Sequence, residues 1–199
     1  LGQPQLMAVH ESRLASSDLW VRESVQVCLA GGSTMQRLLE ASVVERTLQA
    51  TVALLALTPI VTYVLWIADG CEAFVPFISD MDLPPRSGFT FTLGYALSGI
   101  LLATTGVQLG VLRERWMSSA RMSQSWVNLN RFSVLAAVAA GISLFWISFT
   151  PWDEYLGLHI VQANVIFSGS VIWAFCVTLA TWKMSQEEGG FSDVLAPRA

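Results

Sequence analysis

The chain has 199 residues, of which 53% are hydrophobic and only 13% are charged, and its formal net charge is −4. Soluble domains carry about 25% charged residues, so this composition excludes an ordinary soluble protein and indicates one that crosses a membrane. No basic patch with interleaved aromatic residues is present, which argues against a nucleic-acid partner. We therefore expect an all-α, polytopic membrane protein.

The first 46 residues form a polar extension that differs from the rest of the chain. Within it, Ser33 and Gln36 have the spacing of a capping box, and apolar residues then recur on one helical face. This pattern predicts an amphipathic helix over Thr34–Glu45, an arm that lies on the membrane surface or on a partner. A flexible polar tail is the alternative. Residues 1–17 lack the continuous apolar core of a signal peptide.

Four apolar windows follow, and each is long enough to cross the roughly 30 Å hydrocarbon core as a helix. None of them contains Asp, Glu, Lys or Arg. They predict a four-transmembrane-helix bundle over residues 47–184, followed by a polar tail over residues 185–199. Pro59 predicts a kink in the first window. The windows are Thr47–Ala68, Ser87–Leu112, Phe132–Trp152 and Tyr155–Trp182.

Basic residues predict which span ends share a side of the membrane. Arginines precede the first span and lie at 113–131 between the second and third, whereas the connections 69–86 and 153–154 hold six acidic residues and only Arg86. The positive-inside bias therefore places both termini and the connection 113–131 in the cytosol, matrix or stroma. Residues 69–86, which we call the acidic connection, then lie on the lumenal or external side. Four indoles fall at or near span ends, at headgroup level: Trp66, Trp116, Trp152 and Trp182.

Small residues recur at helical spacing in the second and third windows. Such residues let membrane helices approach each other closely, so we expect them to form the packing contacts of the bundle. The candidates are Gly94, Ser98, Gly106, Gly110, Ala137 and Gly141.

The sequence offers little for catalysis. It contains no HExxH, GxSxG, Walker loop or CxxC motif. Asp80 and Asp82 provide too few oxygen ligands for a hard cation, which takes about six. The topology separates Cys28 from Cys71, so no disulfide framework is expected. We predict no catalytic residue and no metal site.

Polar residues inside the spans are better functional candidates, because burying them is costly unless they are paired. His159 and Asn164 lie early in the fourth window, and Gln108 lies near the end of the second. One interpretation gives His159 a hydrogen bond within the bundle, and the other makes it a ligand for a lipid headgroup or a pigment metal. We expect bound lipid and leave a pigment open.

The stretch FVPFISDMDLPPRSGFTF resembles the lumenal loop of the DRAM/Frag/Sfk family of multipass membrane proteins. An Asn before the third window, and His159, Ala163 and Phe167 in the family's His-xxx-Ala-xxx-Phe spacing, extend the resemblance over roughly residues 50–184. The resemblance implies a six-span, non-enzymatic endomembrane protein with roles in autophagy, lipid-linked traffic or lipid organisation. The chain departs from that pattern in having four spans and its own N-terminal extension.

These features predict that the acidic connection is a structural clasp between the first two spans. Asp80 is expected to accept hydrogen bonds from nearby amides or Ser79 and to lie near His159. The predicted clasp residues are Pro76, Ile78, Ser79, Asp80, Pro84 and Pro85.

For the function, we expect a non-catalytic accessory subunit of a larger respiratory or photosynthetic complex. Its partners would be other membrane-protein subunits and lipids, in an organellar inner or thylakoid membrane. The four-span bundle, the start at Leu1 and the interfacial arm favour this hypothesis. The alternative is a stand-alone endomembrane or lysosomal protein that modulates autophagy or lipid organisation, and a lipid-modifying enzyme ranks third.

Overall fold

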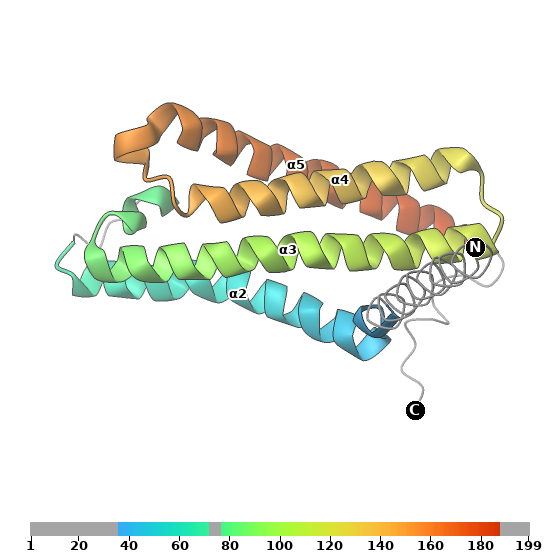
Figure 1. Cartoon of the computed structure of the whole chain (residues 1–199), viewed down its shortest axis with the longest axis horizontal. Coiled ribbons are helices and arrows are strands. Elements are labelled where there is room, and N and C mark those ends of the chain that lie inside the picture. Colours follow the sequence, from blue (N-terminus) through green and yellow to red (C-terminus); the bar gives the residue numbers. More distant parts are fainter. Residues whose placement is uncertain (1–35, 72–76, 188–199) are drawn as a thin grey trace, which may run out of the picture. The chain divides into compact units, whose positions relative to one another are not determined.

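The computed structural model describes residues 36–71 and 77–187, and it divides the chain into two units, Leu1–Val43 and Val44–Ala199. The described residues are helical and contain no strand (Figure 1). Four of the helices are long and apolar enough to cross a membrane, which confirms the predicted all-α, four-span architecture. In chain order the elements are α2 (Ala41–Ala68), the 3-10 helix η1 (Ile78–Asp82), α3 (Pro85–Ser119), α4 (Gln124–Ile147) and α5 (Trp152–Gln186).

The start of α2 differs from the predicted amphipathic helix. The helical turn that precedes it breaks at Leu39 and Glu40, whose amides donate to carbonyls only three residues back, and α2 then begins at Ala41. The predicted helix over Thr34–Glu45 is thus interrupted, and Ala41–Glu45 are instead the first turns of α2. No glycine or proline separates these residues from the first span, so the helix continues into it. Thr34 lies outside the described residues.

The two central helices, α3 and α4, supply most of the buried surface of the bundle. In their apolar windows 50% and 44% of the residues are buried, compared with 17% in α2 and 11% in α5. Figure 1 shows α2 alongside α3 and α5 alongside α4. The larger core cluster joins α3 and α4 with η1 through Met81, Phe91, Tyr95, Leu102, Ala140, Leu144 and Ile147.

The connection predicted at 113–131 is mostly helical. α3 has 35 residues, which at 1.5 Å each make about 52 Å, well beyond a hydrocarbon core of about 30 Å. Only residues 120–123 connect α3 to α4, so Arg113 and Arg131 are helical residues. Hydropathy marks the boundary of the apolar window, whereas the helix itself continues into the polar residues beyond that boundary.

The third span ends earlier than predicted. α4 ends at Ile147, and Trp152 is the first residue of α5. Pro151 lies between them, where a residue without an amide proton suits the position before a helix. Asp153 and Glu154, predicted as a connection, form the first turn of α5, because carboxylates are favourable at a helix N-terminus.

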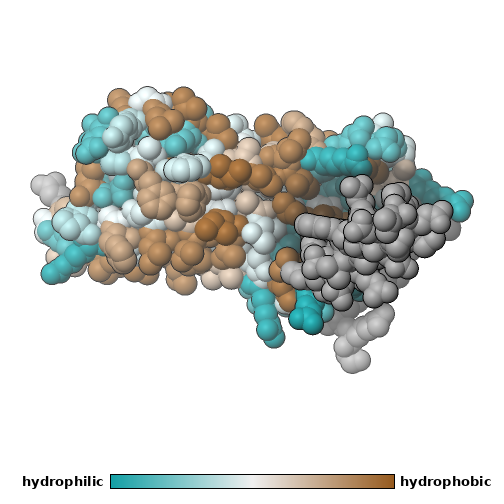
Figure 2. Space-filling model, viewed as in Figure 1, coloured by the Kyte–Doolittle hydropathy of each residue, from teal (hydrophilic) through white to brown (hydrophobic). Residues whose placement is uncertain are grey.

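The surface polarity agrees with a membrane-spanning bundle. On the face in Figure 2, hydrophobic residues gather over much of the length of the helices, and hydrophilic residues gather towards the ends. We call the end with η1 and the α4–α5 connection the acidic end, and the end with the α3–α4 connection the basic end.

Candidate functional site

The α3–α4 interface is built on glycines that leave no room for a side chain. A Cβ on Gly106 would lie 2.5 Å from the Cβ of Ala137. A Cβ on Gly99 would lie 2.5 Å from the carbonyl oxygen of Gly141. A Cβ on Gly110 would lie 2.0 Å from Val134 Cγ2. The structure therefore places four of the predicted packing residues in one helix–helix contact: Gly106, Gly110, Ala137 and Gly141.

Threonines carry the contact between α2 and α3. A Cβ on Gly94 would lie 2.4 Å from Thr58 Cγ2, so Thr58 fills the space that this glycine leaves. Ser98 is fully buried and donates to the Gly94 carbonyl across 2.7 Å. Thr51 and Thr105 share a buried hydrogen bond of 2.9 Å between their hydroxyls. The outer helix α2 is thus held by polar as well as apolar contacts, as is common between membrane helices.

At the acidic end, the end of α2 supports the start of α3. The Ser87 amide donates to Asp69 Oδ2 across 3.4 Å, and Arg86 Nε lies 3.8 Å from Asp69 Oδ1. Asp69 therefore provides a negative charge and an acceptor at the N-terminus of α3, where both are favourable.

The predicted clasp residues of the acidic connection lie in or beside η1 and at the start of α3. Asp80 accepts a hydrogen bond from the Phe77 amide across 3.0 Å, which closes its own turn. Pro76 lies outside the described residues. The remaining predicted residues are half-buried or exposed: Ile78, Ser79, Pro84 and Pro85.

The neighbouring residues Met81 and Asp82 contact the helices of the bundle. Met81 is 4% exposed and belongs to the core cluster with Phe91. The carbonyl of Asp82 presses on α3 at Gly88, where a Cβ would lie only 2.2 Å from that oxygen. The side chain of Asp82 interacts electrostatically with His159. The expected proximity of Asp80 to His159 stays a prediction, and the electrostatic interaction found for His159 is with Asp82.

His159 closes the corner between α4 and α5. Its Nδ1 lies 2.7 Å from the carbonyl oxygen of Thr150. A carbonyl only accepts, so Nδ1 carries a proton, and in the neutral form of the imidazole Nε2 is the nitrogen that would bind a ligand. The Thr150 hydroxyl also lies 2.6 Å from Gln162 Oε1. This geometry matches the interpretation that gives His159 a hydrogen bond within the bundle.

A cleft of about 370 Å³ opens at the acidic end, with Asp82, Thr92, Ser148, Asp153 and Glu154 as its polar lining. Burial raises the pKa of the Asp82 carboxyl above its usual 3.8, and the negative charge of Asp153 adds to this effect. The hydrogen bond from Thr92 and the charge of His159 act in the opposite direction. Within residues 36–71 and 77–187, no three His, Cys, Asp or Glu side chains are grouped to hold a metal ion.

The basic end contains a buried polar contact that the sequence did not reveal. Arg113 is 5% exposed, and its Nε donates to Asn130 Oδ1 across 2.9 Å. Asn130 in turn donates from Nδ2 to the Gly110 carbonyl across 2.8 Å. The Nη2 atom of Arg113 is buried and has no hydrogen-bond partner among the described residues. The chain Gly110–Asn130–Arg113 joins α3 to α4 beside a second apolar cluster of Met117, Val127, Ala180 and Met184.

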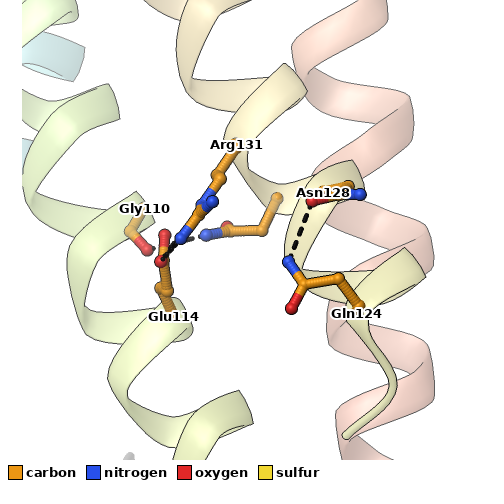
Figure 3. Close-up of polar contacts among 6 residues, drawn as sticks. Gly110, Glu114, Gln124, Asn128 and Arg131 are labelled. Atoms are coloured by element: carbon orange, nitrogen blue, oxygen red, sulfur yellow. Dashed lines mark hydrogen bonds and ion pairs between the residues drawn. The ribbon is translucent and has the colours of Figure 1, made fainter.

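Two surface contacts lie at the same end (Figure 3). Arg131 of α4 donates from Nη2 to Glu114 Oε1 of α3 across 2.6 Å. Gln124 donates to Asn128 across 3.0 Å within α4. The signal that could have revealed the buried contact is the helical spacing of Gly110, Arg113 and Met117, which continues the buried face of α3 beyond the apolar window.

The other two polar candidates differ in their surroundings. Gln108 is 4% exposed within α3. Asn164 is exposed on α5, and its Nδ2 donates to the Ile160 carbonyl across 2.9 Å. The bundle therefore encloses Gln108 and leaves Asn164 outside.

Comparison with known families gives a match over residues 47–196, to the Frag1/DRAM/Sfk1/Cwh43P N-terminal domain. The chain belongs to this family. Membership confirms the resemblance seen in the ISD–proline stretch and in the spacing of His159, Ala163 and Phe167. Comparison with curated proteins and with solved structures gives no match. As a member of the Frag1/DRAM/Sfk1 family with four apolar helices, the chain is a multi-pass membrane protein.

Proposed function

We propose that this Frag1/DRAM/Sfk1 protein is a non-catalytic accessory subunit of a larger membrane assembly, such as a respiratory or photosynthetic complex in an organellar membrane. The observation that carries the proposal is that polar side chains of the bundle form hydrogen bonds between its own parts. His159, Asn130 and Thr105 each form hydrogen bonds that join one helix or connection to another. Such bonds support a scaffold, whereas a catalytic site needs polar groups that face a substrate.

The uneven burial of the helices also supports the proposal. With only 17% and 11% of their apolar windows buried, α2 and α5 offer broad faces to lipid or to other subunits. Association between membrane helices depends on close packing and on hydrogen bonds between them. Bound lipid would occupy any part of these faces that no subunit covers.

A second candidate function is that of a stand-alone endomembrane protein that modulates autophagy or lipid organisation. The family match favours it, since the resemblance implies those roles.

Purification from native membranes in a mild detergent, without cross-linking, tests the two candidates. Native electrophoresis followed by identification of the co-migrating polypeptides should find the chain in fixed stoichiometry with other membrane subunits. Migration of the chain without such subunits, together with altered lipid distribution or autophagy after its deletion, would favour the second candidate.

A further inference from the structure

The outward face of α5 carries an uncovered carboxamide. Its exposed residues recur with helical period, and Asn164 lies at the centre of this face together with Ser168, Val171 and Phe175. The buried residues of α5, among them Gly169, lie on the opposite side of the helix.

Asn164 also lies deep within the membrane. Trp152 lies just before a kink in α5 at Tyr155, and from that kink Asn164 follows by about 14 Å along the helix axis. It precedes Trp182 by about 27 Å. These indoles fall near the two span ends, and the hydrocarbon core between the headgroup layers is about 30 Å thick. The side chain of Asn164 therefore lies at hydrocarbon depth, where water cannot satisfy it.

The hydrogen-bonding capacity of Asn164 is only partly used. One amide proton goes to the Ile160 carbonyl, and the second proton and the Oδ1 acceptor have no partner among the described residues. The hydroxyl groups on the same face differ, because each has a single proton and donates it within α5. Ser168 donates to the Asn164 carbonyl, and Thr178 donates to the Ala174 carbonyl across 2.8 Å.

The other three helices show no such group on their outward faces. The exposed residues are all apolar in α2 from 52 to 67, in α3 from 89 to 107 and in α4 from 132 to 146. Those faces suit lipid. The α5 face combines an unpaired amide with the small side chain of Ser168 one turn away, which is the composition of a helix–helix contact in a membrane.

We propose that the outward face of α5 binds the same face of a second copy of this chain, with the Asn164 carboxamides paired across the twofold axis. Copies inserted in one orientation are related by an axis along the membrane normal, so each residue near the axis meets itself at the same depth. A carboxamide has both a donor and an acceptor and is therefore its own complement. The free N–H of one Asn164 donates to Oδ1 of the other. This pairing goes beyond the proposed function, because it would hold for a subunit and for a stand-alone protein.

Disulfide trapping in vesicles tests the geometry. Cys28, Cys71 and Cys176 are replaced by alanine, the full chain is placed in phosphatidylcholine vesicles, and Ser168→Cys is oxidised. We expect a disulfide-linked dimer. Val61→Cys, on the exposed apolar face of α2, is the matched control and should remain monomeric at the same ratio of protein to lipid. Equal cross-linking of the two variants, or none at Ser168→Cys, would overturn the proposal.

Energy transfer between donor- and acceptor-labelled copies tests the role of Asn164. Asn164→Leu should raise the dissociation constant of the dimer about tenfold, the typical effect of a hydrogen bond between membrane helices. Asn164→Gln keeps a donor and an acceptor and should retain most of the affinity. Because Asn164 is exposed in the single copy, its replacement should leave the melting temperature of the monomer unchanged. An undiminished dimer in Asn164→Leu would refute the pairing, as would cross-linking of Ser168→Cys to a different polypeptide in native membranes.

Discussion

Arg113 of α3 donates from Nε to Oδ1 of Asn130 of α4 across 2.9 Å, and both side chains are buried. A guanidinium in this position depends on its acceptor, because the cost of leaving a buried charged donor without a partner exceeds the net value of the bond. The contact therefore holds α3 and α4 together at the basic end.

We predict that Asn130→Leu lowers the free energy of unfolding by about 2–3 kcal/mol, since it removes the acceptor of Arg113 and the donor to Gly110. Denaturant unfolding in mixed micelles measures the change. Asn128→Leu is the control: Asn128 is exposed and bonds within α4, so its loss should cost less than about 0.5 kcal/mol. If both variants were equally stable, Arg113 would not depend on Asn130.

The contact of Gly106 with Ala137 predicts that no side chain larger than that of glycine is tolerated at residue 106 without loss of stability. Gly106→Ala places a Cβ about 2.5 Å from the Cβ of Ala137 and should cost about 1–3 kcal/mol through overpacking. Adding Ala137→Gly should recover most of this loss. Gly157→Ala is the control, because a Cβ there meets no atom within 4 Å, and alanine has the higher helix propensity. Thermal unfolding in detergent compares the variants. An unchanged melting temperature for Gly106→Ala would mean that the helices can separate without cost.

Met81 should anchor the acidic connection. Its side chain is 4% exposed among the core residues of α3 and α4, so Met81→Ala should lower the free energy of unfolding by about 2–4 kcal/mol. Ile78, three residues earlier, is 52% exposed, and Ile78→Ala should change stability by less than about 0.5 kcal/mol. Limited proteolysis within the acidic connection should also be faster in Met81→Ala than in the unmodified chain. Equal behaviour of the two variants would show that the connection is not held by Met81.

His159→Ala should destabilise the bundle by about 1–3 kcal/mol, because it leaves the Thr150 carbonyl without its imidazole donor in a buried corner. Val161→Ala, on an exposed residue of the same helix, serves as the control. Calorimetric or denaturant unfolding distinguishes the two. A loss of bound pigment or metal from native His159→Ala membranes, without loss of stability, would instead assign the residue a cofactor.

The stability of the acidic end should depend on pH through Asp82. Its pKa is raised in the folded chain by burial, so the folded state holds the proton more tightly than the unfolded state does. The resulting stability is complete below the usual value of 3.8 and is lost as the pH rises through the raised value. Asp82→Asn should therefore be more stable than the unmodified chain at pH 7, and the difference should close towards pH 4.

The hydrogen bond from Thr92 provides an internal control for this dependence. It lowers the pKa of Asp82 by stabilising the ionised carboxylate, so Thr92→Val should reduce stability more at pH 7 than at pH 4. Melting curves over this range measure both variants. If neither substitution changed the dependence of the melting temperature on pH, Asp82 would not be the group responsible for it.

The sequence by itself determined the class of the protein, the number of spans and the family. The apolar windows that contain Gly106 and His159 are each long enough to cross the membrane. The ISD–proline stretch carries the resemblance to the family. These features are local, and hydropathy or a short motif is sufficient to detect them. The helix ends predicted from the sequence were less accurate. Arg113 and Arg131 mark the headgroup layer, and both helices continue beyond these residues.

Only the tertiary structure decided which side of each helix is inside. His159 and Asn164 lie five residues apart in one apolar window, yet one is buried in the α4–α5 corner and the other faces outward. In a soluble helix a polar face would distinguish them, but a membrane helix is apolar towards lipid and towards its neighbours alike. The neighbours of each side chain depend on how the four helices pack, so the partner of Arg113 and the uncovered amide of Asn164 could be found only in three dimensions.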